Sequence, residues 1–331
     1  MEKYISNIDE YTSINLANEL RNTNLNSQKN IIFQFDDNVS CSPFGMLCME
    51  NSIKTIRKEN INKNFSIQLN KDAESIKYAG HMGFFKSISE NINFGKSPGE
   101  ASGSSNYVPI TKIDFINYRQ NTFFRYTDPL RYIEYESRNL ARVLAQNNKQ
   151  LEELFTYMIR EIIRNSQEHG KVNEAWICAQ NWNNKNIAEI AILDNGIGYK
   201  ESLCKKYGKI INNDEDAIRL ALKPGVTESY NNIHALEEEN SGFGLYVASQ
   251  LCNELNGSFT ILSGDTFLKR NNGAVTIRKS YHQGSVISMS IDTTKRFNYN
   301  ELLSKIVDRG ERELKSYGKA SELSKGKFII Q

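Results

Sequence analysis

The sequence predicts two domains of different class, a small α/β domain over residues 1–132 and an α+β two-layer sandwich over residues 133–293. The first class follows from strand-like runs that alternate with helical runs in the amino-terminal part. The second follows from a long amphipathic helical pattern and the apolar strand-like runs that come after it. A basic tail over residues 294–331, with one expected helix, completes the chain.

The first domain is expected to alternate between helices and strands. Its expected elements are a polar helix over 9–21, a strand over 31–35, a helix over 42–57, a strand over 65–69, a helix over 73–85 and a strand over 107–115. Ser42 suits the N-cap of its helix, and Pro43 suits the first helical position. Pro109 has no amide hydrogen to donate, so it favours the edge of a sheet.

The second domain is expected to begin with helical segments over 135–167. After them come strands over 175–182 and 187–193, helices over 214–222 and 243–255, and strands over 258–262, 274–281 and 285–291. Apolar residues between Leu151 and Ile162 recur at the spacing of one helix face. That face is therefore expected to pack on the sheet.

Composition and charge narrow the class of protein. The 331 residues suffice for two domains, and a net charge of +2 provides no global field for nucleic acid or an anionic membrane. The amino terminus lacks the apolar core of a signal peptide, and no run is long and apolar enough to span a bilayer. Five scattered cysteines without a Cys-x-x-Cys pair argue against zinc and disulfides. A cytoplasmic protein is expected.

The first motif that indicates chemistry is Glu161-Ile162-Ile163-Arg164-Asn165. Residues four apart on a helix share a face, so Glu161 and Asn165 project together. The amide oxygen of Asn165 is a suitable ligand for Mg²⁺, and the carboxylate of Glu161 can orient or deprotonate a water. A solvated pair on a helix surface is the alternative interpretation.

The second motif, Asp194-Asn195-Gly196-Ile197-Gly198, directly follows the expected strand over 187–193. A carboxylate at the end of a buried strand can accept a hydrogen bond from an adenine amino group, and the glycines allow the backbone to approach the ring. A simple tight turn gives the same letters. The third motif, Ser241-Gly242-Phe243-Gly244-Leu245, opens an apolar helix whose first amides can bind phosphate.

Together the three segments resemble the N, G1 and G2 boxes of the GHKL superfamily of gyrase, heat-shock chaperones, mismatch-repair ATPases and histidine kinases. The resemblance extends over residues 151–292 and implies a Bergerat ATP-binding fold that uses ATP with Mg²⁺. It implies that Glu161 is the general base, that Asn165 binds Mg²⁺ and that Asp194 recognises adenine. Gly196 and Gly198 are expected at the ring, Gly242 and Gly244 at the phosphates, and Ile197, Ser241, Phe243 and Leu245 beside them as further cofactor-binding residues.

Other segments extend the resemblance. The stretch between Gly198 and Ser241 is similar to the family's mobile ATP lid, in which Lys223, Thr227 and Asn240 are candidates to contact phosphate. Lys223 fits a simple turn equally well. Ser285 stands where the family has the threonine of a Gly-Thr pair near adenine. His169 completes an Asn-x-x-x-His pattern also found in anti-sigma serine kinases.

Departures from the family exclude some of its members. None of the four histidines fits the phosphoacceptor of a histidine kinase, and too few residues follow Asp292 for the transducer domain of a gyrase-type enzyme. The chain is most similar to compact bacterial GHKL proteins. By analogy alone, that similarity suggests a role in signalling or phage defence.

The order of elements in the first domain resembles a STAS domain, although the usual Asp-Ser-x-Gly form is missing. In STAS domains a GHKL kinase phosphorylates a serine at the start of a helix, and Ser40 or Ser42 has a comparable place here. Ser42 equally fits the N-cap alone. The resemblance implies that this helix packs on a mixed sheet and that the domain binds a partner or regulates the other domain.

Three functions remain open. The first is an ATPase that switches its interaction with a partner protein, with Glu161 activating water. The second is a serine/threonine kinase that acts on a STAS-like protein, with Glu161 activating a hydroxyl. The third is a non-catalytic nucleotide-binding module. The expected partner is a protein, either STAS-like or a second copy in a homodimer, and neither nucleic acid nor a membrane is expected.

Overall fold

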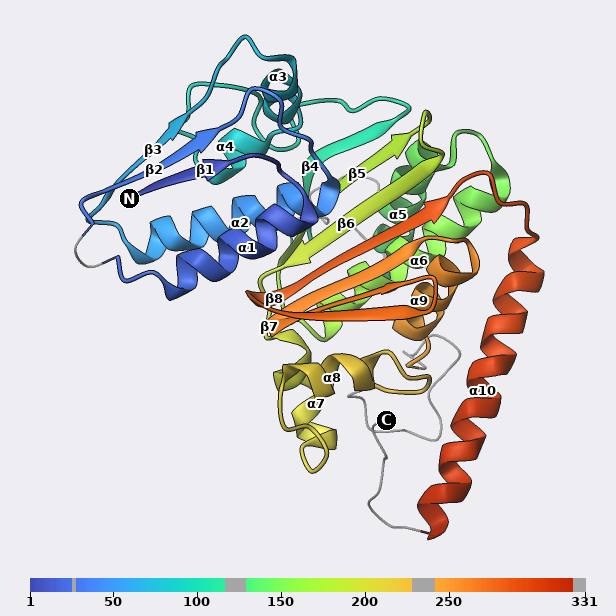
Figure 1. Ribbon diagram of the computed structural model, residues 1–331. Helices are drawn as coiled ribbons and strands as arrows, with labels where there is room; N and C mark the ends of the chain where they lie inside the picture. Colours follow the sequence, from blue (N-terminus) through green and yellow to red (C-terminus); the bar gives the residue numbers. More distant parts are fainter. Residues whose placement is uncertain (26–27, 117–128, 228–241, 324–331) are drawn as a thin grey trace.

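The computed structural model describes residues 1–25, 28–116, 129–227 and 242–323. Figure 1 shows two β-sheets of different size, with a pair of helices between them. The smaller sheet has three strands in the order β1-β2-β3, and the larger has five in the order β4-β5-β6-β8-β7. The architecture is mixed, with helices and strands in both parts.

The smaller sheet is entirely parallel. Its strands are β1 Glu2–Ile5, β2 Asn30–Phe35 and β3 Asn64–Gln68. Helix α1 (Glu10–Asn22) joins β1 to β2, and helix α2 (Pro43–Glu59) joins β2 to β3. Because each helix returns the chain to the same end of the sheet, successive strands run in the same direction. The mixed sheet implied by the STAS resemblance is therefore wrong, and β1 was not expected at all.

Caps fix the starts of both helices. The side chain of Asp9 accepts a hydrogen bond from the amide of Thr12, and Ser42 Oγ accepts one from the amide of Gly45 at 3.1 Å. The N-cap role predicted for Ser42 is confirmed. The helix expected over 73–85 is instead two helices, α3 (Glu74–His81) and α4 (Phe84–Ile88), because Gly83 adopts a positive φ of 89° between them.

The larger sheet is antiparallel. Its strands are β4 Tyr107–Asp114, β5 Glu174–Trp182, β6 Ile187–Asp194, β7 Ser258–Asn271 and β8 Ala274–Asp292. The sequence pattern placed the β4 segment with the first domain, whereas the structure pairs it with β5. Pro109 does lie in an edge strand, as predicted, next to an irregularity in the pairing. The two strands expected within 274–291 form the single strand β8.

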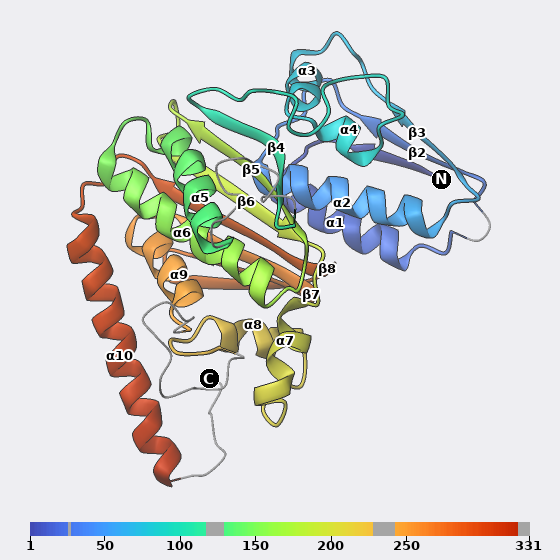
Figure 2. The same ribbon diagram turned by 180° about the vertical axis from the view of Figure 1, so that it is seen from behind.

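Helices bury both faces of the larger sheet (Figures 1 and 2). On one face lie α5 (Pro129–Ala145), α6 (Lys149–Glu168) and α9 (Gly244–Glu254), and side chains such as Phe155 and Met158 join the sheet in one apolar core. On the other face lie α1 and α2, where Met46 shares a second core with Leu193 and Phe267. The amino-terminal unit, which comprises β1–β3 and α1–α4, thus packs through α1 and α2 on the face of the larger sheet opposite α5, α6 and α9.

Three helices complete the fold. Helices α7 (Gly198–Tyr207) and α8 (Asp214–Ala221) contact one another and strand β7. Helix α10 (Tyr299–Leu323) contacts α9 and α6 along the side of the molecule (Figure 1). Among the helices of the described ranges, none is long and apolar enough to cross a bilayer.

Candidate functional site

Helix α6 holds the first motif at the edge of a pocket. Asn148 caps this helix by accepting hydrogen bonds from the amides of Gln150 and Leu151. The predicted apolar face is buried on the sheet, and Glu161 is buried as well, with 7% of its surface exposed. Glu161 and Asn165 are one turn apart, so both point from α6 toward the start of α9.

The two carboxylate oxygens of Glu161 have different surroundings. The Arg160 guanidinium donates to Oε1 from Nε at 3.1 Å and from Nη2 at 2.9 Å. Its Nη1 donates to Oε2 of Glu134 on α5 at 3.2 Å. The other oxygen of Glu161, Oε2, lies so close to Gly244 that a methyl group on Gly244 would overlap it. Arg160 therefore fixes the carboxylate with one oxygen facing the first turn of α9.

Glycines allow the third motif to approach α6. Gly242 has a φ of 74°, a region that side-chain-bearing residues rarely adopt, and its carbonyl accepts a hydrogen bond from the amide of Gly225 at 3.1 Å. Gly244 has no space for a side chain beside Glu161. No side chain at Gly242 or Gly244 therefore covers the start of α9, and the amino-terminal end of a helix favours an anion.

Asp194 is the last residue of strand β6, and its carboxylate accepts several hydrogen bonds. Its Oδ2 accepts hydrogen bonds from Ser166 Oγ at 3.0 Å and from Ser285 Oγ at 2.6 Å. Its Oδ1 accepts one from the amide of Gly196 at 2.9 Å. The carboxylate is 3% exposed, so these donors hold it in one orientation. An oriented, buried carboxylate can accept a further hydrogen bond from an amino group in the pocket.

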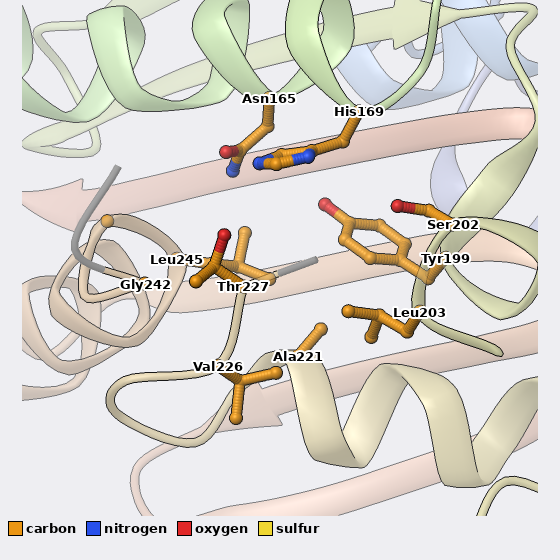
Figure 3. A pocket seen from close by; sticks show the side chains of 11 residues that line it. Asn165, His169, Tyr199, Ser202, Leu203, Ala221, Val226, Thr227, Gly242 and Leu245 are labelled. Carbon is orange, nitrogen blue, oxygen red and sulfur yellow. The ribbon is translucent and has the colours of Figure 1, made fainter. Parts of the chain in front are cut away.

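Two adjoining cavities connect these motifs. Both are lined by Asn165, His169, Tyr199 and Ser202. The first continues to Gly242, Gly244, Leu245 and Thr227, together with Leu203, Ala221 and Val226. The second continues to Asp194, Gly198 and Ser285, together with Ile162, Ser166, Gly170 and Ile287. Figure 3 shows Asn165 and His169 above the first cavity, with Tyr199 and Thr227 facing it from other segments.

Not every predicted residue lines these cavities. Glu161 adjoins the first one only through Gly244, and Gly196 packs against Gly170 at the end of α6. Ile197 donates its amide to the carbonyl of Gly170, and the Phe243 ring packs on Tyr246. Lys223 is not among the lining residues, although Ala221 before it and Val226 after it are. Asn240 and Ser241 lie outside the described residues.

Several residues at the site were not predicted. Tyr199 and Ser202 belong to α7, a helix within the segment that resembled a lid. Burial raises the pKa of the Tyr199 hydroxyl, and the nearby Asp194 carboxylate raises it further. Ser166 directly follows the first motif, and this position was a usable signal. His282 contacts Asp194 from β8 across a long separation in sequence.

The side chains fit a magnesium ion only together with phosphate. Within the described part of the chain, no three His, Cys, Asp or Glu side chains are grouped so as to hold a metal. Mg²⁺ commonly keeps several waters and takes one or two protein ligands plus phosphate oxygens. The amide oxygen of Asn165, beside the first turn of α9, meets that description.

Comparison with known families gives one match. Residues 150–295 match the model of a family described as histidine kinase-, DNA gyrase B- and HSP90-like ATPase. The matched range covers all elements from α6 to β8, including each segment that lines the two cavities. Neither the curated proteins nor the solved structures contain a match to the chain.

Proposed function

Because residues 150–295 form a domain of the histidine kinase-, DNA gyrase B- and HSP90-like ATPase family, we propose that this protein binds ATP with Mg²⁺ and hydrolyses it to switch its interaction with a partner protein. The three boxes recognised in the sequence fall within this domain. The observation that best supports hydrolysis is the orientation of Glu161, whose Oε2 faces the first turn of α9.

The arrangement of the pocket supports one direction for the bound nucleotide. Adenine is assigned to the cavity at Asp194, Gly198 and Ser285, because the carboxylate there can accept a hydrogen bond from the amino group. The phosphates are assigned to the first turn of α9 at Gly242 and Gly244. Asn165 lines both cavities and is the proposed magnesium ligand.

The proposed role of Glu161 follows from its two oxygens. Arg160 engages Oε1, so Oε2 is the oxygen directed to the phosphate end of the pocket. A carboxylate placed there can orient a water for attack on the γ-phosphate and accept its proton. Arg160 keeps the carboxylate in place and does not itself contact the pocket.

A route from the phosphate end to a partner-binding surface is available through α10. A Cβ placed on Gly310 of α10 would lie 2.8 Å from ring atoms of both Phe243 and Tyr246. Leu314 of α10 packs against Gly225, whose amide is bonded to the carbonyl of Gly242. A shift of Gly242–Gly244 on nucleotide binding would therefore be transmitted to α10, which is our candidate for the switched surface.

The replacement Glu161→Gln tests this proposal. It keeps the side-chain shape but removes the base, so we expect ATP turnover to fall by at least ~100-fold. ATP affinity should stay within about threefold of the parent value, since binding does not need the proton transfer. Glu168→Gln, on an exposed carboxylate of the same helix, is the matched control. A parent protein that binds ATP but shows no turnover, even with its partner, would rule out the ATPase.

A serine/threonine kinase is the second candidate, because His169 lines both cavities in the Asn-x-x-x-His arrangement noted above. In that case Glu161 would accept the proton of a protein hydroxyl. Incubation with γ-labelled ATP and a STAS-like protein should then label a serine or threonine of that protein. Label released only as inorganic phosphate would support the ATPase.

A further inference from the structure

A chain of hydrogen bonds joins the amino-terminal unit to the adenine end of the pocket. Asn51 of α2 lies with its Nδ2 3.3 Å from Nδ1 of His282, which belongs to β8. The other ring nitrogen of His282, Nε2, lies 3.0 Å from the backbone carbonyl oxygen of Asp194. Through these two contacts, α2 on one face of the larger sheet is connected to the end of β6, where Asp194 lies.

The chemistry of the partners fixes the state of the imidazole. The amide nitrogen of Asn51 can only donate, so Nδ1 must be the acceptor. The carbonyl oxygen of Asp194 can only accept, so Nε2 must carry the proton. Both bonds are therefore satisfied by one neutral tautomer of His282, and no other state satisfies both.

Burial isolates this connection from water. His282 is 3% exposed and Asn51 is 7% exposed. Burial lowers the pKa of the His282 imidazole, and this outweighs the opposite effect of the Asp194 carbonyl and carboxylate, so the neutral form is retained near pH 7. A small cavity beside Asn51 and His282 is lined by Arg21 and Glu59, the nearby charged groups of α1 and α2.

We propose that Asn51 and His282 are positioning residues for Asp194, through which the amino-terminal unit sets the affinity and base selectivity of the nucleotide site. The proposal rests on the proposed ATP binding. His282 holds the last peptide of β6, and that peptide sets where the Asp194 carboxylate points. Asn51 in turn holds the ring of His282 in the tautomer that can donate to this peptide.

Such a connection works in both directions. Anything that moves α2 away from β8 weakens adenine binding, and bound adenine nucleotide in turn stabilises the contact between α2 and β8. A molecule or protein that docks on the amino-terminal unit would regulate the ATP site in this way. The energy available is that of a buried hydrogen bond, so the effect is a modulation and not an on/off switch.

The test compares Asn51→Leu with the parent protein by calorimetry with ATP and GTP. Leucine has a similar size but cannot donate, so we expect ATP affinity to fall by roughly 5- to 10-fold. GTP affinity should not fall, because guanine offers no amino group at the position that Asp194 recognises. Ser52→Ala is the matched control, since Ser52 lines the same cavity but donates its hydroxyl to the Cys48 carbonyl within α2.

The outcomes separate this inference from the proposed function. Equal losses for ATP and GTP would indicate a general structural role and overturn the inference, as would unchanged ATP affinity in Asn51→Leu. A parent protein that binds no ATP would overturn the proposed function itself, and this inference with it.

A measurement on the unaltered protein avoids any dependence on the folding of variants. Nitrogen-15 spectra of the histidine side chains should show His282 as the neutral tautomer protonated at Nε2, with a shift when ATP is added. A ring protonated at Nδ1, or no response to bound ATP, would contradict the proposal.

Asn51→Asp adds a pH-dependent readout. A carboxylate at this position favours a protonated Nδ1, so both bonds are retained only by the imidazolium. ATP affinity of this variant should therefore decline as pH rises through the raised pKa of His282, while the parent protein stays level from pH 7 to pH 9. Identical pH profiles for the two proteins would count against the connection.

Discussion

The two faces of the larger sheet each pack against a helix that carries a buried carboxylate, but the two carboxylates have different surroundings. Glu161 of α6 has both Nε and Nη2 of Arg160 within 3.1 Å of one oxygen. Glu50 of α2 is 1% exposed, and the Nζ of its nearest cation, Lys54, lies 4.0 Å away. Its Oε2 accepts no hydrogen bond from the described residues.

This difference supports the catalytic role proposed for Glu161, whereas the burial of Glu50 only lowers the stability of the fold. At Glu161 an arginine fixes one oxygen and leaves the other facing Gly244 at the start of α9. At Glu50 burial raises the pKa to about 7, although Lys54, Ser87 and Lys58 each oppose the shift. The helix on the pocket face thus carries a carboxylate held by an arginine, and the helix on the other face carries one whose Oε2 accepts no hydrogen bond from the described residues.

The largest expected effect is on the pocket face, from Gly244→Ala. The added methyl overlaps Oε2 of Glu161, so either the carboxylate or the first turn of α9 must move. We expect ATP turnover to fall by about 100-fold or more. Steady-state kinetics at saturating ATP measures this, with thermal unfolding as the check on folding. Turnover within twofold of the parent value would show that this contact does not matter for catalysis.

On the opposite face, Glu50→Gln should stabilise the protein at alkaline pH. The folded-state pKa of Glu50, about 7, exceeds the ordinary value of 4.5, so stability is lost as pH rises from 4.5 to 7 and stays lost above it. Removing the ionisable group should add roughly 1–3 kcal/mol to the free energy of unfolding at pH 8. The difference between variant and parent should shrink toward zero near pH 4.5.

Urea denaturation at several pH values measures this difference, with Glu59→Gln as the control on an exposed carboxylate of the same helix. The control should change stability little at any pH. A Glu50→Gln variant that is less stable than the parent at pH 8 would mean that the charged carboxylate has a compensating partner.

A smaller effect is expected from Ser42→Ala at the start of α2. The hydroxyl accepts the amide hydrogen of Gly45, and loss of such a cap costs about 1 kcal/mol of stability. Ser40→Ala provides the comparison, because the exposed Ser40 hydroxyl donates to Asn7 and caps no helix, so it should matter less. Equal losses from both replacements, measured by urea denaturation, would show that the cap is not the reason for the serine.

The difference between contacts that are local in sequence and contacts that are distant in sequence explains what could be predicted. Asp194 ends a strand and Gly198 lies four residues beyond it, and Glu161 and Asn165 are four apart on a helix, so local geometry alone brings the members of each pair close together. Asn51 and His282 are 231 positions apart, and neither has a neighbour in sequence that reveals the contact. The partner strand of Tyr107–Asp114 likewise could not be predicted, because the sequence pattern of a strand does not specify which sheet the strand joins.

Some residues were misjudged for a related reason. Phe243 lies inside a phosphate-binding motif, yet its ring packs on Tyr246 and faces Gly310 of α10. Neighbouring positions at the start of a helix point in different directions, so membership of a motif does not place each side chain in the pocket. Tyr199 was overlooked because its segment resembled a lid and not a helix.

The central claim, that the pocket binds ATP with adenine at Asp194, is tested most directly by calorimetric titration of Mg²⁺-ATP into the parent protein and Asp194→Asn. The parent protein should bind one ATP per chain. The variant keeps the shape of the side chain but loses a charged acceptor, so its affinity should fall by roughly 10- to 100-fold. ATP binding of equal strength in both proteins, or no binding to the parent protein, would contradict the account.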